Sequence, residues 1–311
     1  MAANSVLDEA YGRLHHTGPE FVGWLSNHGP MAADALIRIG RAGEVARWVD
    51  GYAQRLEEEP APRWAIDAAG WREPLGDPSR LGDWLAFFAT AVHAEPWEAL
   101  LATWWPRLLP GAIASATHGL IRTGHAVRAL REEVTAERLD DIPAAGIGEG
   151  GGTRTRLARV AASTEWPRAT QALRPVTPAA AGPAALDELV DAAVDRYLHW
   201  AHGNPVMLVH AATAPRAAAL VIPALPTQLW QPTYNTAWAV TAAISAAYRP
   251  ADPAAPPAHS PEDPESVTDR AVAVADEHAI KFVEVALESH RRGNGTALAA
   301  ADRASELIGR A

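Results

Sequence analysis

His278 and Lys281 are the residues whose types and spacing first suggest chemistry in this sequence. They lie three positions apart, and Lys281 is the only lysine of the chain. Apolar residues recur around them at helical spacing without Gly or Pro, which predicts a helix with both side chains on one face. A lysine differs from an arginine because its buried amine can lose a proton and act as a nucleophile. The pair therefore suggests a reactive amine beside an imidazole.

An ordinary salt bridge is the alternative interpretation of Lys281. Glu277 precedes it by four residues and Glu284 follows it by three. On an exposed helix face such pairs contribute only a few tenths of a kcal/mol. The scarcity of lysine also fits a composition that favours arginine throughout. The spacing alone leaves both interpretations open.

Histidines in apolar surroundings suggest a metal site. The chain has 12 histidines and no cysteine. Five of the histidines face inward by their local sequence: His28, His118, His125, His210 and His278. One such residue is more often a hydrogen-bonded core histidine than a ligand, but the group favours a metal with imidazole ligands, which suit iron, zinc, copper and nickel. The spacing does not show that these histidines converge, and metalloprotease and facial-triad motifs are absent.

His118 and His125 lie seven residues apart in a helix predicted over 112–131. Seven residues make about two turns, so both imidazoles share one face. Gly119 and Gly124 adjoin the two histidines. A glycine inside a helix costs about 1 kcal/mol relative to alanine, so both glycines predict close approach of another backbone.

Composition narrows the class of protein. The chain has 311 residues, a net charge of −10 and no basic block, which argues against nucleic-acid and anionic-membrane partners and favours a small-molecule ligand. Without cysteine there are no disulfides, thiolate nucleophiles or iron–sulfur clusters. No run reaches the ~20 apolar residues of a membrane span, and the N-terminus lacks a signal pattern. A soluble, cytoplasmic protein is expected.

Periodicity predicts a single large all-α domain over residues 1–311, with the metal site between helices. Pro30 is expected to open a helix over 31–39 and to leave His28 in the turn before it. A Pro-rich surface connection is predicted for 249–265.

Gly146, Gly148 and Gly151 match a dinucleotide-binding fingerprint by letter, but no strand pattern precedes them, so nucleotide binding is not expected.

Five segments, in order along nearly the whole chain, resemble the questin oxidase-like family, whose enzymes oxidatively open anthraquinone and related polyketide rings. The segments are His28-Gly-Pro-Met31, His118-Gly-Leu-Ile121, His210-Ala-Ala-Thr-Ala-Pro215, Tyr234-Asn-Thr-Ala-Trp238 and Asp276-Glu-His-Ala-Ile-Lys281. The resemblance implies an α-helical oxygenase that uses O2 and a mononuclear Fe(II), held by four histidines and a lysine carboxylated by CO2. NADPH is a possible reductant.

The resemblance, carried over residue by residue, implies this ligand set: His28, His118, His210, His278 and the carbamate of Lys281. A carbamate supplies the anionic oxygen that the missing Asp or Glu would have given. His125 is predicted to be catalytic, by orienting a ligand or relaying a proton. Several tryptophans are candidate walls for a planar substrate, with core packing as the alternative for each: Trp84, Trp104, Trp105, Trp230 and Trp238.

The leading hypothesis is therefore an oxygenase that cleaves a C–C bond of an aromatic polyketide or quinone. Two other classes stay open at this stage. A metal-dependent hydrolase could use the same carboxylated lysine to bind two zinc-like ions and lower the pKa of water. A non-catalytic helical binding protein would hold its histidines in core hydrogen bonds and leave Lys281 unmodified. The sequence predicts neither the exact substrate nor the oligomeric state.

Overall fold

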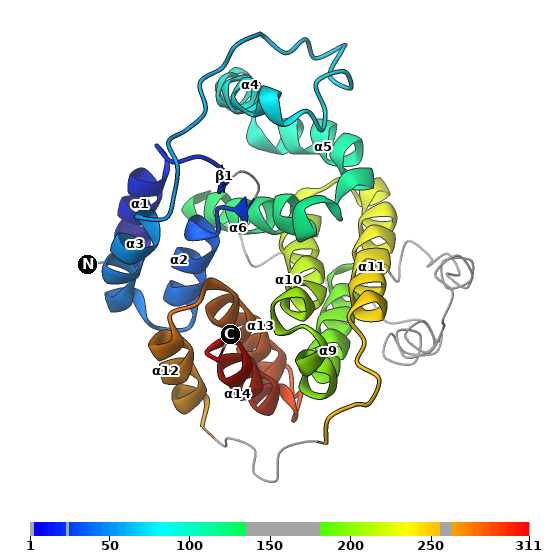
Figure 1. Cartoon of the computed structure of the whole chain (residues 1–311). Helices are drawn as coiled ribbons and strands as arrows, with labels where there is room; N and C mark the ends of the chain where they lie inside the picture. The colour runs from blue at the N-terminus through cyan, green and yellow to red at the C-terminus, as the bar shows by residue number, and fades with distance from the viewer. Residues whose placement is uncertain (1–2, 23–24, 135–180, 256–262, 311) are drawn as a thin grey trace.

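Helix α10 (Pro205–Val221) lies at the centre of the fold (Figure 1). Asn204 Oδ1 accepts a hydrogen bond from Met207 N at 2.9 Å, and Pro205 occupies the first turn, where its missing N–H is not needed. Most of the following residues are apolar, so every face of the helix can be buried. The helix packs against α6 (His118–Val134), α9 (Pro183–Trp200), α11 (Trp230–Ala247) and α13 (Glu277–Arg291).

The expectation that no run reaches the length of a membrane span is wrong by length and composition for Pro205–Ala224, which is α10 and the short turn after it. Of its most apolar stretch, however, 72% is buried inside the protein. The core helix of a soluble protein has this property, because its neighbours replace the lipid.

The computed structural model describes residues 3–22, 25–134, 181–255 and 263–310. In these ranges the regular structure is helical except for one antiparallel pair, β1 (Glu20–Phe21) with β2 (Leu25–Ser26). Most of the helices contribute to one main hydrophobic core, and two smaller clusters lie beside it. The predicted all-α single domain is therefore confirmed. The glycines of the fingerprint-like match, residues 146–151, lie outside the described ranges.

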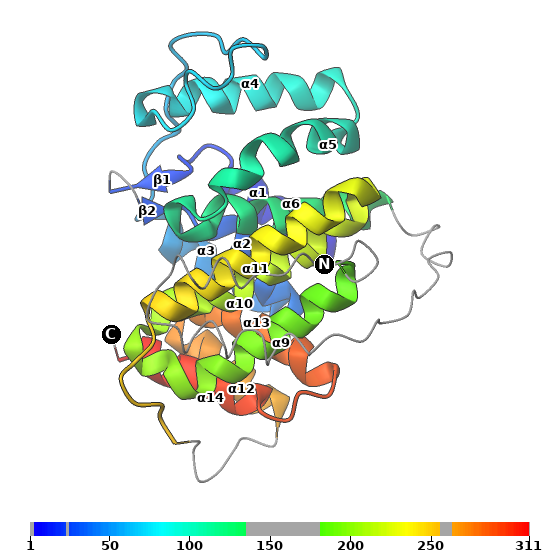
Figure 2. The same cartoon turned by 90° about the vertical axis from the view of Figure 1, so that its right-hand side faces the viewer.

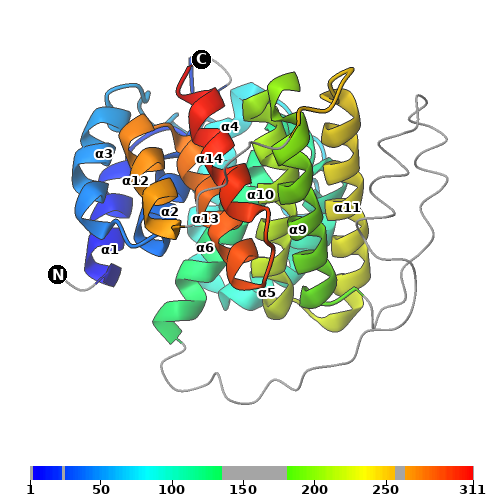
Figure 3. The ribbon, with the colours of Figure 1, turned by 90° about the horizontal axis from the view of Figure 1, so that it is seen from below.

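The remaining helices of the main body flank the α6–α10–α13 centre. On one side lie α1 (Ala3–Leu14), α2 (Gly29–Arg38) and α3 (Val45–Ala53). Seen from below, α12 (Pro264–Val274) lies beside α14 (Ala297–Ile308), and α14 lies beside α9 (Figure 3). The core residues Leu36, Ile121 and Phe282 come from three different helices and are fully buried. Burial of this apolar surface is the main force that holds the helices together.

Helices α4 (Leu81–Ala94) and α5 (Trp97–Leu108) form a layer of their own, above α6 and α11 in Figure 2. Their aromatic side chains pack against one another in a cluster separate from the main core. Its members are Trp71, Trp84, Phe87, Phe88 and Trp104. Edge-to-face contacts of this kind stabilise the layer beyond the burial of area alone.

The start of α6 differs from the predicted helix over 112–131. The helix begins only at His118, because Ser115, Ala116 and Thr117 have φ angles of 46°, 49° and 71°. Positive φ is unfavourable for residues with a Cβ, so a helical pattern in the letters could not reveal it. Helix α12 begins at Pro264, inside the connection predicted for 249–265.

The two glycines of α6 have different roles. A Cβ on Gly124 would lie 2.7 Å from Cα and Cβ of Ala217, so Gly124 allows α6 and α10 to approach closely. The prediction of close backbone approach is correct there. It is wrong at Gly119, where a Cβ would meet no atom of the described residues within 4 Å.

Candidate metal centre

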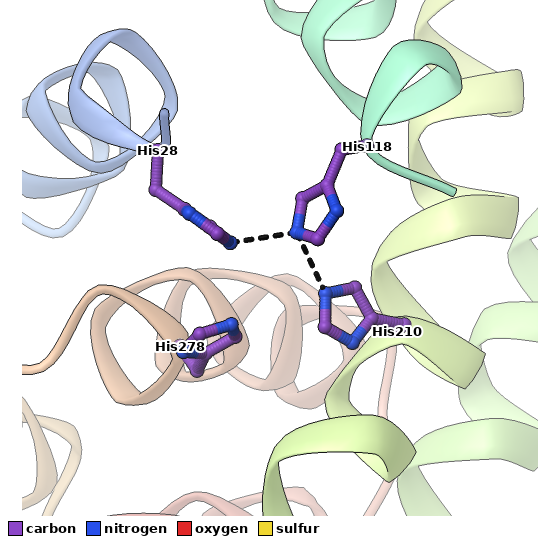
Figure 4. Close-up of side chains that lie close together, drawn as sticks. All are labelled: His28, His118, His210 and His278. Atoms are coloured by element: carbon purple, nitrogen blue, oxygen red, sulfur yellow. Dashed lines mark hydrogen bonds between the residues drawn. The ribbon is translucent and has the colours of Figure 1, made fainter. Parts of the chain in front are cut away.

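Four of the predicted ligands come together where four helices surround one point. His28 precedes α2, His118 is the first residue of α6, His210 lies in α10, and His278 lies in the first turn of α13. Helix α6 packs on α2 and α10, and α13 packs on the same two helices, so each side of the point carries one imidazole (Figure 4). One nitrogen of each ring lies within 4.8 Å of the others. This histidine group could hold a metal ion.

The spacing of the ring nitrogens suits a shared ion. His118 Nε2 lies 2.7 Å from His28 Nε2 and 3.1 Å from His210 Nε2, the contacts drawn as dashed lines in Figure 4. Metal–imidazole bonds are about 2.0–2.1 Å long, so ligand nitrogens around one ion lie roughly 3–4 Å apart. The observed group needs only small side-chain adjustments to reach that geometry.

The outer nitrogen of each ring has an acceptor. His28 Nδ1 donates to the Ser26 carbonyl oxygen at 2.6 Å, and His210 Nδ1 donates to that of Val206 at 3.1 Å. His118 Nδ1 donates to the Ser115 carbonyl oxygen, which the left-handed turn before α6 aims at it. His278 Nδ1 lies 3.2 Å from Asp276 Oδ1. Carbonyl and carboxylate oxygens only accept, so Nδ1 carries the hydrogen in all four rings.

The four Nε2 atoms therefore turn unprotonated lone pairs toward one another. Burial, reinforced by the charge of Lys281, lowers the pKa of His118 to about 3 and keeps the pKa values of His28 and His210 well below the usual range. These three imidazoles are therefore neutral at pH 7. Because Nδ1 already carries the hydrogen of each ring, no Nε2 can donate a hydrogen bond to its neighbour. A 2.7 Å contact between two lone pairs is unfavourable unless a cation lies between them. The donor set thus fits a metal ion.

Lys281 lies one turn beyond His278 on α13 and is only 1% exposed. Within the described residues its Nζ has no hydrogen-bond partner. Burial lowers the pKa of this amine to about 8, and its charge acts on His28, His118 and His210. The exposed salt bridge is excluded, because Glu277 pairs with Arg55 and Glu284 pairs with Arg128. A buried, unpartnered amine beside the histidine group is suited to carboxylation by CO2.

An aromatic pair on α3 fixes the backbone at two of the ligands. Tyr52 Oη accepts a hydrogen bond from His28 N at 2.7 Å, and Trp48 stacks on Tyr52 at 4.7 Å. Trp48 Nε1 in turn donates to the carbonyl oxygen of Ala275, at 2.8 Å. Ala275 ends α12 in a left-handed conformation, and Asp276 then caps α13 by accepting from His278 N. Sequence patterns carry no signal for this support, because α3 looks like an ordinary amphipathic helix.

His125 does not join the histidine group. Its Nδ1 bonds Asp34 Oδ2 at 2.8 Å, and Arg128 Nε bonds the same oxygen at 3.0 Å. Arg128 also pairs with Glu284. This charge network of Asp34, His125, Arg128 and Glu284 links α2, α6 and α13 beside the metal centre. The prediction that His125 is catalytic stays a prediction, and its imidazole has a structural partner.

Asp34 and Arg128 are functional-site neighbours that sequence reasoning misses. A lone acid in the apolar run Met31–Leu36 is the available signal, since an acid on a buried face needs a partner. Burial alone would raise the pKa of Asp34, but the hydrogen bond from His125 and the charge of Arg128 hold it well below its usual value.

The candidate wall tryptophans have core contacts. Trp84 and Trp104 belong to the aromatic layer of α4 and α5. Trp105 Nε1 donates to Thr233 Oγ1 at 2.8 Å, Trp230 Nε1 donates to the Leu225 carbonyl oxygen at 3.1 Å, and Trp238 is 2% exposed. Packing, the alternative interpretation, accounts for all of these contacts.

Fold and site together define a class: an all-α protein with a buried tetra-histidine group that could bind a metal ion. Comparison with known proteins found no matching family model and no significantly similar curated protein or solved structure. The particular function therefore depends on the chemistry of the site.

Proposed function

We propose that this protein is a cytoplasmic, non-haem iron oxygenase of the questin oxidase-like kind, which uses O2 to cleave a C–C bond of an aromatic polyketide or quinone. The observation that carries the proposal is the pairing of four convergent imidazole lone pairs with a buried Lys281 amine that has no partner among the described residues. Imidazole is a common ligand of non-haem iron. The order of the ligands along the chain matches the resemblance.

The chain's own residues would prepare the site in two ways. The Nδ1 hydrogen bonds of the histidine group hold each ring in the tautomer that presents Nε2. The neutral Lys281 amine would attack the carbon of CO2 and release a proton to water, which leaves an anionic carbamate. Iron, when bound by these groups, supplies the one-electron chemistry with O2 that side chains lack.

The reaction class has two forms that differ in electron balance. In a dioxygenation both oxygen atoms enter the product, and no external reductant is needed. In a Baeyer–Villiger-type insertion one oxygen atom enters the ring beside the carbonyl and the other leaves as water, so two electrons must come from a donor such as NADPH. Measuring NADPH consumption against O2 uptake separates the two forms.

The hydrolase alternative has less support. In the described ranges one further group could hold a metal, formed by Asp276, Glu277 and His278. Its acids already have other partners, because Asp276 caps α13 and Glu277 pairs with Arg55. It also shares His278 with the histidine group, so a single ion is the better fit.

Elemental analysis of untagged protein purified without added metal tests the proposal. We expect about one iron per chain in the wild type, a labile CO2 adduct by intact mass, and O2 uptake with polycyclic quinones. His118→Ala and Lys281→Arg should lose the iron, whereas the matched control His202→Ala should keep it, since His202 is exposed. Failure to bind iron after reconstitution with ferrous iron and bicarbonate would contradict the proposal, and two zinc-like ions would favour the hydrolase.

A further inference from the structure

Arg122 is a partly buried arginine that no carboxylate of the described residues neutralises. In this part of the chain it forms no ion pair, and its one hydrogen bond is a long contact of 3.4 Å from Nη1 to the Asn27 carbonyl oxygen. Arg128, six residues further along the same helix, pairs with both Asp34 and Glu284. A guanidinium that is partly withdrawn from water without a counter-ion is unfavourable, so its position beside the candidate metal centre favours an external anion.

The position of Arg122 places its charge at the metal centre. It follows His118 by one turn of α6, so the two side chains lie on one face. Its hydrogen-bond acceptor, the Asn27 carbonyl, belongs to the peptide bond that leads into His28. The charge of Arg122 also acts electrostatically on His118. Arg122 therefore borders the histidine group between α2 and α6.

A phenol with a free hydrogen accompanies this charge. Tyr52 Oη accepts from His28 N, and within the described residues the Tyr52 hydroxyl donates to no acceptor. The charge of Arg122 reaches the Tyr52 phenol as well. Arg122 and Tyr52 contact the Asn27–His28 peptide bond from opposite sides, because the C=O and the N–H of a trans peptide point in opposite directions. An anionic oxygen is the ligand that would satisfy the unused N–H donors of the Arg122 guanidinium.

We propose that Arg122 is the anion-binding residue of the metal centre and that the substrate carries a carboxylate or an ionised phenol. This inference rests on the proposed function, because it assigns the substrate class of the same site. A planar guanidinium binds two oxygens at once, so it would fix the orientation of an aromatic acid as well as select it. Neutral quinones without an acidic group would bind weakly.

Binding of two matched probes tests the inference without any turnover. 2-Naphthoate carries the anionic group, and 2-naphthamide is its uncharged isostere. Titration calorimetry would be done on protein loaded anaerobically with ferrous iron and bicarbonate, and on chelator-treated protein, so that the Arg122 contribution is measured with and without iron. We expect Arg122→Met to weaken naphthoate binding ~10- to 100-fold and to leave naphthamide binding unchanged. Arg122→Lys should recover part of the affinity.

The controls separate this inference from the proposed function. Arg47→Met removes an exposed arginine of α3 and should leave both affinities unchanged. Equal naphthoate affinity in wild type and Arg122→Met would overturn the inference while the iron content stands. Loss of iron or of the CO2 adduct in Arg122→Met would also overturn it, because Arg122 would then serve the metal site. If Arg122→Met does not fold, Arg122→Lys and Arg122→Gln decide by the same comparison of probes.

Discussion

Two neighbouring regions of the same helices differ in whether their buried polar groups have partners. The charge network of Asp34, His125, Arg128 and Glu284 has its charges compensated, since Arg128 lies between the two carboxylates and Arg38 also pairs with Asp34. The metal centre leaves its groups uncompensated, with facing lone pairs and an amine that has no partner in the described part of the chain. Helices α2, α6 and α13 contribute to both regions. The difference shows which region has its charges paired within the fold and which one has donor groups that could bind a metal ion.

The comparison also separates stability from function. A buried ion pair that loses one partner leaves a charge in a low-dielectric interior, so the charge network should respond strongly to mutation. An uncompensated buried amine already destabilises the metal-free protein. Replacing it with an apolar side chain should therefore raise the free energy of unfolding. Mutations in the two regions should therefore change the free energy of unfolding in opposite directions.

The largest effect is expected from Arg128→Met. The substitution leaves Asp34 and Glu284 buried without their shared cation, and we expect the metal-free protein to lose about 3–5 kcal/mol of unfolding free energy. Urea unfolding followed by circular dichroism measures the loss. The control Arg47→Met removes an exposed pair with Glu44 and should change stability by about 0–1 kcal/mol. A loss in Arg128→Met no larger than the control would show that the two carboxylates do not depend on this arginine.

Lys281→Met should act in the opposite direction and depend on pH. Burial lowers the pKa of the folded-state amine to about 8 from the ordinary 10.5, so the unfolded chain binds more protons between these values. Wild-type stability should therefore rise by about 3 kcal/mol as the pH rises through this window. Lys281→Met lacks this dependence, so its advantage over wild type should be greatest at pH 8 and below.

Paired urea unfolding of the wild type and Lys281→Met at pH 7.5, 9 and 10.5 measures this difference, in metal-free buffer without bicarbonate. Other titrating groups are common to both proteins and cancel in the comparison. Parallel pH curves for the two proteins would mean that the Lys281 amine is solvated or paired in the folded state.

The ligand histidines could be proposed from the sequence, but the partners that surround them could not. Helical spacing places His278 and Lys281 on one face, and the structure agrees. The same spacing places Glu277 and Glu284 within reach of Lys281, and in the fold these acids pair with Arg55 and Arg128 instead. Arg128 and Glu284 are 156 positions apart. Periodicity indicates which face of a helix is buried, whereas the tertiary fold decides which residues meet there.

The start of α6 shows a second limit of the sequence. The letters of residues 112–117 fit a helix, yet three successive residues adopt positive φ and direct the Ser115 carbonyl to His118. Such conformations cost of order 1–3 kcal/mol each and persist where surrounding contacts impose them, often at functional sites. Local propensity cannot predict a conformation that opposes it.

The smallest effect on stability is expected from His125→Gln. This variant tests whether His125 serves the charge network alone or also the metal centre. Its Nδ1–H donates to Asp34, and a glutamine amide can replace that bond, so the unfolding free energy should fall by only about 0.5–1.5 kcal/mol. The iron content should stay at the wild-type value, whereas His118→Gln should lose it. Elemental analysis of both variants, prepared side by side, makes the comparison. Loss of iron in His125→Gln would show that the two regions are not independent, because the charge network would then be needed to hold the metal ligands in place.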